Sequence, residues 1–275
     1  MSTINTNISS LNAQRNITKS AGDLSTSMQR LSSGLRVNSA KDDAAGLSIA
    51  TKMDAQVRGM AQASRNANDG ISMIQTADGA LGNISDALQR MRELAVQAAN
   101  GTNGADETGN IGTEMSALND EIARIADTAS FNGISLMKSG APLEVDIQVG
   151  ANQNEAIKVK FADSDGYAKF DATADLKVGT PAEAGATIKK LDDALKALNT
   201  ERASLGTAQN RMGYAISNLS SSIENQSAAK SRIMDTDYAA ETSKLSRSQI
   251  LQQAGTAMLA QANSAPNSVM SLLRG

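Results

Sequence analysis

Large apolar residues recur at alternating spacings of three and four along most of this chain. The longest run follows Pro181 and continues to Ile233 without a slip. A heptad pattern of this length predicts a single long helix that supercoils with partner helices. Arg202, Gln209, Gln226 and Lys230 are the polar interruptions of the run. We predict that the seam of this helix consists of Leu191, Leu195, Leu198, Leu205, Met212, Ile216, Leu219 and Ile223.

Two further stripes of the same spacing lie in the N-terminal half, over residues 74–98 and 115–129. A polar run with four glycines, at 100–112, separates them and is predicted to be a loop. Stripes joined by short connections are most simply buried on one another. The alternative is that each stripe binds a different protein. We therefore predict a mainly α fold: a long antiparallel helical bundle or coiled coil formed by the N- and C-terminal segments.

Between Pro142 and Pro181 the period changes from about 3.5 to two. Apolar and polar residues alternate over 143–149 and again over 157–161, on either side of a turn-rich gap. This pattern predicts a small β-hairpin with one buried face. Residues 162–182 lack a heptad pattern and are predicted to form a short surface excursion with weak structure.

The two ends of the chain combine apolar stripes with very few charges. Residues 1–40 carry only five charged side chains, yet Ile17, Ala21, Leu24, Met28, Leu31 and Leu35 keep heptad spacing. The last forty residues are similar, with an apolar set that includes Leu245, Leu251, Ala254 and Met258. Such segments bury too little apolar surface alone to offset chain entropy. We expect both ends to be disordered in a monomer and helical once packed.

The composition excludes most catalytic chemistry. There is no His and no Cys, so imidazole bases, thiolate nucleophiles and thiolate metal sites are all missing. We expect no cofactor, no metal and no enzyme activity. The adjacent aspartates at 42–43 and 192–193 are interpreted as charges at a helix start and on an exposed helix face. The formal net charge of −3, without a basic stripe, argues against nucleic acid, and no apolar stretch could span a membrane.

Several long motifs resemble those of bacterial flagellins, in the same order along the chain. They are RLSSGLRVNSAKDDAAGLSIA at 30–50, LQRMRELAV at 88–96, FNG at 131–133, SRIMDTDYAAE at 231–241 and SLLR at 271–274. The resemblance covers roughly 1–140 and 185–275. It implies a structural subunit, secreted without a cleaved signal, that polymerises into the extracellular filament used for swimming motility.

The resemblance also implies a division of the chain into five segments. An inner coiled-coil domain is expected from 1–40 and 236–275, a helical rod domain from 41–141 and 183–235, and the hairpin with a short exposed variable region from 142–182. The implied partners are other copies of the chain, the type III export apparatus, an export chaperone, and the cap and junction proteins.

One surface of the rod is singled out by the resemblance. Positions that match a contact for the neighbouring subunit and for Toll-like receptor 5, read on the monomer, are Gln89, Arg90, Leu94 and Glu114. From the residues alone, this surface is equally a set of solvated charge pairs. Two other functions remain open at this point: a hook–filament junction protein of related build, and a coiled-coil adaptor unconnected with flagella.

Overall fold

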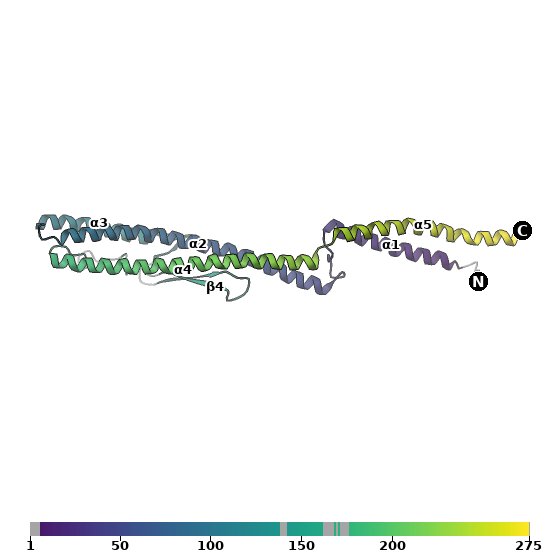
Figure 1. Cartoon of the computed structure of the whole chain (residues 1–275), viewed down its shortest axis with the longest axis horizontal. Coiled ribbons are helices and arrows are strands. Elements are labelled where there is room, and N and C mark those ends of the chain that lie inside the picture. Colours follow the sequence, from purple (N-terminus) through teal and green to yellow (C-terminus); the bar gives the residue numbers. More distant parts are fainter. Residues whose placement is uncertain (1–5, 138–141, 162–167, 169, 171–175, 275) are drawn as a thin grey trace. The chain divides into compact units, whose positions relative to one another are not determined.

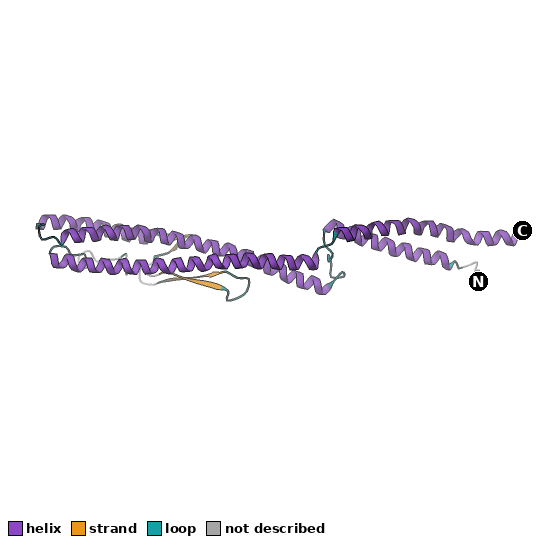
Figure 2. Ribbon diagram, viewed as in Figure 1, coloured by secondary structure: helices purple, strands orange, loops and turns teal. Residues whose placement is uncertain are grey.

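The computed structural model describes residues 6–137, 142–161, 168, 170 and 176–274, most of them in long helices (Figures 1 and 2). The described elements, in chain order, are α1 (Ile8–Ser33), α2 (Ala44–Ala98), α3 (Ala105–Thr128), β1 (Ser130–Phe131), β2 (Ile134–Ser135), β3 (Leu143–Gln148), β4 (Ala156–Phe161), α4 (Pro181–Met234) and α5 (Tyr238–Arg274). The prediction of a mainly α fold with a small β region is confirmed.

The chain divides into two compact units, Met1–Ala55 with Glu224–Gly275, and Gln56–Ile223. In the first unit α1 and α5 lie side by side and antiparallel (Figure 1). At one end of this pair the side-chain amide of Asn7 donates to the carbonyl of Ala262 at 2.7 Å. Towards the other end Ser27 contacts Glu241. Residues from the two ends of the chain therefore form one helical pair.

The α1–α2 turn is tied to the α4–α5 turn by main-chain hydrogen bonds. Gly34 caps α1 with φ +72°, a left-handed conformation that a side chain disfavours. Its carbonyl accepts from the amide of Thr236 at 3.0 Å, while the amide of Arg36 donates to the carbonyl of Met234 at 2.6 Å. The two chain reversals are held together as a consequence.

The aspartates after this turn are used locally. Asp42 accepts hydrogen bonds from the hydroxyl and the amide of Ser39, which hold the pKa of its carboxyl below the ordinary value. Asp43 accepts from the amide of Gly46 at 2.8 Å, the position of an N-cap for α2. Both carboxylates stabilise the turn and the helix start, which agrees with the interpretation made from the sequence.

In the second unit, α2, α3 and α4 run alongside one another (Figure 1). They share one apolar core of Leu, Ile, Met and Ala side chains. The hairpin packs on this core through the alternate side chains of β4, and β3 pairs with β4 from Leu143–Phe161 to Gln148–Ala156. Gly70 on α2 leaves room for the side chain of Ile147, because a Cβ at this position would overlap it. The predicted hairpin is thus present and lies against the helices.

The structure corrects the expected loop and one of the expected helical stretches. The loop predicted at 100–112 is shorter, because α3 begins at Ala105 and includes Gly109 and Gly112. Residues 130–135 lie within the expected helical segment 41–141 but form the small β1–β2 hairpin instead. Its turn residues Asn132 and Gly133 both have positive φ, which matches the Asn-Gly preference of a two-residue turn.

The segment after the hairpin also differs from expectation where it is described. Ala168, Leu176 and Val178 are buried in the core of the second unit, not exposed on a surface excursion. The Asn119 amide donates to the carbonyl of Phe170 at 3.1 Å, which attaches this segment to α3. Apolar side chains without regular spacing can still attach a segment to the core, and a search for periodic patterns does not detect them. Residues 162–167, 169 and 171–175 lie outside the described part of the chain.

Candidate assembly surfaces

The α1–α5 pair has a narrow seam with 3-4 spacing on both helices. The inward positions of α5, all buried or half-buried, are Glu241, Leu245, Ser248, Gln252, Gly255, Leu259 and Ala262. Those of α1 are Ser10, Ala13, Ile17, Ser20, Leu24, Ser27 and Leu31. Only five of these fourteen residues are large and apolar: Ile17, Leu24, Leu31, Leu245 and Leu259. The helices approach closely at Gly255, where a Cβ would lie 2.8 Å from Cγ1 of Ile17.

A carboxylate is buried in this seam. The side chain of Glu241 is only 4% exposed, accepts from the hydroxyl of Ser27 at 2.7 Å, and pairs with Lys244 at 3.1 Å. Burial raises the pKa of Glu241, but these two hydrogen bonds and the nearby charge of Arg30 outweigh it and hold the pKa below its ordinary value. The carboxylate is therefore charged at neutral pH inside a helix pair. Sequence patterning had not identified it.

Large apolar side chains remain on the outer faces of the same two helices. Seven such residues are exposed there, among the described positions: Ile8, Leu11, Met28, Tyr238, Ile250, Leu251 and Met258. Met28 was expected on the inward stripe of α1 but is 58% exposed, because Ser27 takes the inward position beside Glu241. Met258, expected within the apolar set of the C-terminal end, is 64% exposed. Folding of a single chain leaves both without a partner surface.

The predicted seam of α4 consists of two rows that differ in burial. Leu191, Leu198, Leu205, Met212 and Leu219, spaced by seven, are buried, and Leu195, Ile216 and Ile223 are half-buried. The basic interruptions fall in the half-buried row. Arg202 pairs with Asp78 of α2 at 2.7 Å, and Lys230 pairs with Asp54 of α2. At these points, α4 contacts α2 through ion pairs flanking an apolar row.

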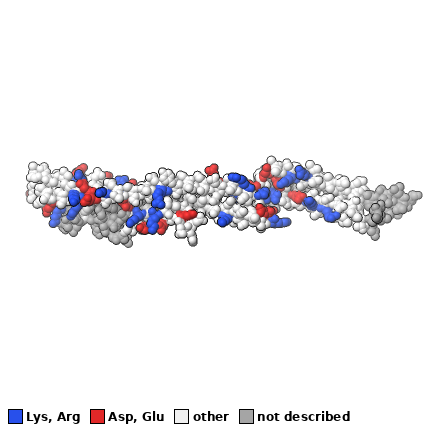
Figure 3. Space-filling view, turned by 60° about the horizontal axis from the view of Figure 1, so that its bottom comes forward, with Lys and Arg blue, Asp and Glu red and all other residues white. Residues whose placement is uncertain are grey.

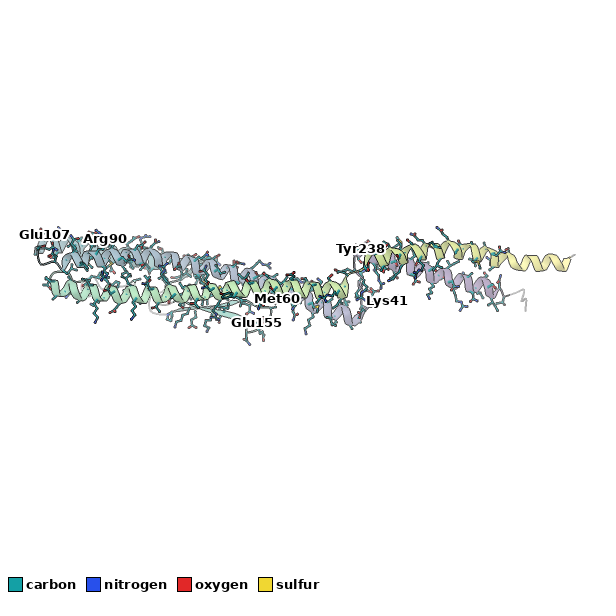
Figure 4. All side chains as sticks on the ribbon, viewed as in Figure 1. Lys41, Met60, Arg90, Glu107, Glu155 and Tyr238 are labelled. Carbon is teal, nitrogen blue, oxygen red and sulfur yellow. The ribbon has the colours of Figure 1, made fainter. Side chains whose placement is uncertain are left out.

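Only part of the surface predicted around Arg90 is assembled. Figure 4 marks the position of Arg90 on α2. Arg90 contacts Glu93 at 3.1 Å and Glu114 of α3 at 3.0 Å, with all three side chains about half exposed or more. The hydrogen bond to Glu114 is the main cause of the raised pKa of Arg90. Gln89 is exposed beside them, whereas Leu94 is 2% exposed and belongs to the core. The buried face of α2 is wide here because α3 and α4 both cover it.

No candidate metal site is found among the residues that the structure describes, and the face shown in Figure 3 has no basic patch. No group of three or more acidic side chains is placed to hold a metal ion in residues 6–137, 142–161 and 176–264. On the face shown in Figure 3, acidic and basic side chains are intermixed along the helices. No described helix is long and apolar enough to cross a membrane. The prominent surfaces are apolar faces and helix seams, which are features of a subunit that assembles with other subunits.

Comparison with known proteins identifies the family. Residues 4–140 match the bacterial flagellin N-terminal helical region, and residues 188–273 match the C-terminal helical region. A flagellin of Halalkalibacterium halodurans is 46% identical over 271 residues, covering 98% of this chain and 99% of that protein. Flagellin A of Vibrio cholerae is 39% identical, covering 98% and 99%. A crystal structure of Bacillus cereus flagellin, 36% identical, has a TM-score of 0.51 and covers 60% of this chain and 94% of that one.

The chain is thus a self-assembling structural subunit and not an enzyme. It belongs to the bacterial flagellin family. It polymerises with itself into the extracellular flagellar filament that serves motility, and matches along the full length of named flagellins favour this role over that of a junction protein or an unrelated adaptor.

Proposed function

We propose that this flagellin polymerises through the outer faces of its paired ends. Segments 1–40 and 236–275 would form the inner coiled-coil layer of the filament, with 41–141 and 183–235 as the rod around it. The hairpin at 143–161 would lie on the outside of this rod. Within the rod, the row that contains Leu198 and Leu205 is the core seam between α4 and α2.

One observation carries the proposal. Of the eleven large apolar side chains that are exposed among the described residues, seven lie on α1 and α5. Burying apolar surface contributes about 25 cal/mol per Å² removed from water. A monomer leaves this contribution unused, whereas copies packed side by side obtain it on both helices. Few charged residues lie on these helices to oppose the contact.

The composition of the α1–α5 seam supports a coupling between assembly and ordering of the ends. The α1–α5 seam is short of large apolar residues, and several of its positions are Ser, Gln or Gly. Such a pair stabilises itself weakly, so contact with other copies supplies much of the free energy that holds both helices. Hydrogen exchange should show both ends weakly protected in a monomer and strongly protected in a filament.

Two point variants of the full-length chain test the proposal. Leu251→Gln and Met258→Gln place a polar amide on the outer face of α5 without touching its seam. We expect both to remain helical monomers that fail to polymerise on addition of salt, as judged by electron microscopy and sedimentation. Gln253→Ala, a change at an exposed polar position of the same helix, is the matched control and should form filaments. Normal filaments from both apolar-to-polar variants would disprove the role of this face.

Deletion of both ends gives an independent test. A chain that contains only 41–235 keeps the three-helix core, so we expect a soluble helical monomer that forms no filament at any salt concentration. If it polymerised, the rod alone would carry assembly and the proposal would be wrong.

A second surface is proposed on the rod, at Gln89, Arg90 and Glu114. The Arg90–Glu114 pair joins α2 to α3 and holds a polar patch in place before any partner arrives. We assign this patch to a contact with the neighbouring subunit and, on the free monomer, with Toll-like receptor 5. Leu94 supports the patch from the core. Arg90→Ala should weaken receptor binding, whereas Arg124→Ala, which removes an exposed pair within α3, should not.

The remaining partners follow from the flagellin family. We propose that an export chaperone binds the C-terminal segment before secretion, that type III export delivers the chain, and that cap and junction proteins contact the filament ends. Co-purification of full-length chain and of a chain lacking 236–275 with the chaperone would test the first of these.

A further inference from the structure

The buried carboxylate of Glu241 takes no part in the apolar outer faces described above. It lies in the seam between α1 and α5, in hydrogen-bond contact with Ser27 and paired with Lys244. A charge at a seam position costs desolvation energy that an apolar side chain at the same position would not, so stability alone does not account for its presence. In coiled coils, a polar group at a seam position fixes the register in which two helices pair.

The surroundings of Glu241 favour one register of α1. Ser27 supplies the hydrogen bond, and Arg30, one turn later, supplies a positive charge whose buried Nε has no hydrogen-bond partner among the described residues. Sliding α1 by one heptad in one direction brings Ser20 and Asp23 to these two places, and Asp23 would repel the carboxylate. Sliding it the other way leaves the carboxylate beyond the end of α1.

The rest of the seam contains little information about register. Most inward positions are Ser, Ala, Leu, Gln or Gly, and a shift of seven residues exchanges one small or aliphatic residue for another. Beyond the seam, the main-chain hydrogen bonds of Gly34 and Arg36 to residues 234–236 restrain the turn that precedes α5. Within the seam, the exceptions are the close approach of Ile17 to Gly255 and the polar contacts of Asn7 and Ser10 near residues 262–263. The latter two are only partly buried, and water replaces exposed hydrogen bonds at little cost.

We propose that Glu241 is the specificity-determining residue of the paired ends, which makes α1 and α5 pair in a single register through Ser27 and Arg30. A fixed register places the exposed faces of the two helices at defined positions relative to each other. Neighbouring copies can then bind both faces at once, as a regular filament requires. This inference rests on the proposed role of the ends in assembly and goes further by naming the residue that sets their geometry.

The absence of cysteine from the chain permits a direct test by disulfide trapping. Ile17→Cys combined with Gly255→Cys reports the register of the structure, because the two side chains would be in contact. Ile17→Cys combined with Ser248→Cys reports a slip of one heptad. Each pair is made in the wild-type, Glu241→Leu and Glu241→Gln backgrounds, and the crosslinks within and between chains are quantified by mass spectrometry in monomers and in filaments.

We expect the wild-type background to give the native crosslink almost exclusively. In Glu241→Leu, the ratio of native to slipped crosslinks should fall at least about tenfold, since a hydrogen bond to a charged group is worth a factor of that order or more. Glu241→Gln keeps a hydrogen-bond acceptor for Ser27, so the crosslink ratio should fall less in this variant. Filament yield should decrease in the same order, with crosslinks between chains increasing in Glu241→Leu.

The double variant Ser27→Leu/Glu241→Leu is the control for unfolding, because it replaces both polar groups with apolar ones. This chain should be at least as helical and as thermally stable as wild type, yet should show the lowered crosslink ratio. A wild-type ratio in both Glu241→Leu and the double variant would overturn the inference. A failure of the proposed role of the ends in assembly would be detected separately. In that case a chain lacking both ends would polymerise, whatever the ratio of native to slipped crosslinks.

Discussion

Leucine-to-alanine changes along α4 should differ in cost according to how many helices surround each site. Leu198 is fully buried in the core shared by α2, α3 and α4. Leu219 is buried in a smaller cluster with Met60 and Ala63 of α2. Truncation leaves a cavity that closes only as far as neighbouring elements can move. Within the usual range of about 2–5 kcal/mol, we expect Leu198→Ala near the top and Leu219→Ala near the bottom.

Ser220→Ala is the matched control for both changes. Its hydroxyl is exposed and donates to the carbonyl of Ile216 in the same helix, so its removal should change stability by no more than about 0.5 kcal/mol. Urea unfolding of the full-length monomer, followed by far-UV circular dichroism, gives the change in the free energy of unfolding for each of the three variants. The comparison is valid if that free energy depends on urea concentration with the same slope in all of them. Equal stability of Leu219→Ala and Ser220→Ala would show that 219 is not a core position. A smaller loss at Leu198 than at Leu219 would refute the cavity argument.

Three further predictions concern the helical ends. Hydrogen peroxide should oxidise the exposed Met28 and Met258 before the buried methionines, and the resulting sulfoxides should slow polymerisation. Peptide mass mapping would locate the sulfoxides, and substitution of both residues by Leu would test the effect on polymerisation. Glu241 has a lowered pKa, so its stabilising contribution is present above pH 4.5 and is lost as the pH falls through its folded-state pKa; thermal unfolding of Glu241→Gln should lack this dependence. Gly34→Ala should destabilise by about 1–2 kcal/mol because φ is positive, whereas Gly22→Ala, in open space on α1, should stabilise by up to about 1 kcal/mol, both measured by thermal melts.

Long-range periodicity was sufficient to predict the helical class of the fold. Heptad spacing identified α4 and the stripes of α2 and α3, and the change to period two identified the β3–β4 hairpin. These features are local, and each is repeated over many residues, so single exceptions do not hide them. Periodicity did not show that the two rows of the α4 seam differ in burial, because this depends on which partner helix lies where.

Local rules failed where a distant contact decides the outcome. Leu176 and Val178 follow a polar segment without any period, yet they are buried against the helical core. The Asn-Gly turn at 132–133 was visible in the sequence, but the short strands beside it have no alternation to reveal them. For Leu94, assigned to the surface by family resemblance, burial follows from α3 and α4 covering the same side of α2.

On α1, Ser27 occupies the seam position that the sequence pattern predicted for Met28, and this difference bears on function. Hydrophobicity favours Met28 as the inward residue, since it keeps the heptad spacing of its neighbours and a buried serine gains little. Ser27 instead faces inward and donates a hydrogen bond to Glu241, 214 residues away. The same choice leaves the thioether of Met28 on the outer face, where it adds to the apolar surface available to another copy. A less apolar seam and a more apolar exterior therefore occur together at this contact, which agrees with the proposed assembly through the outer faces of the two helices.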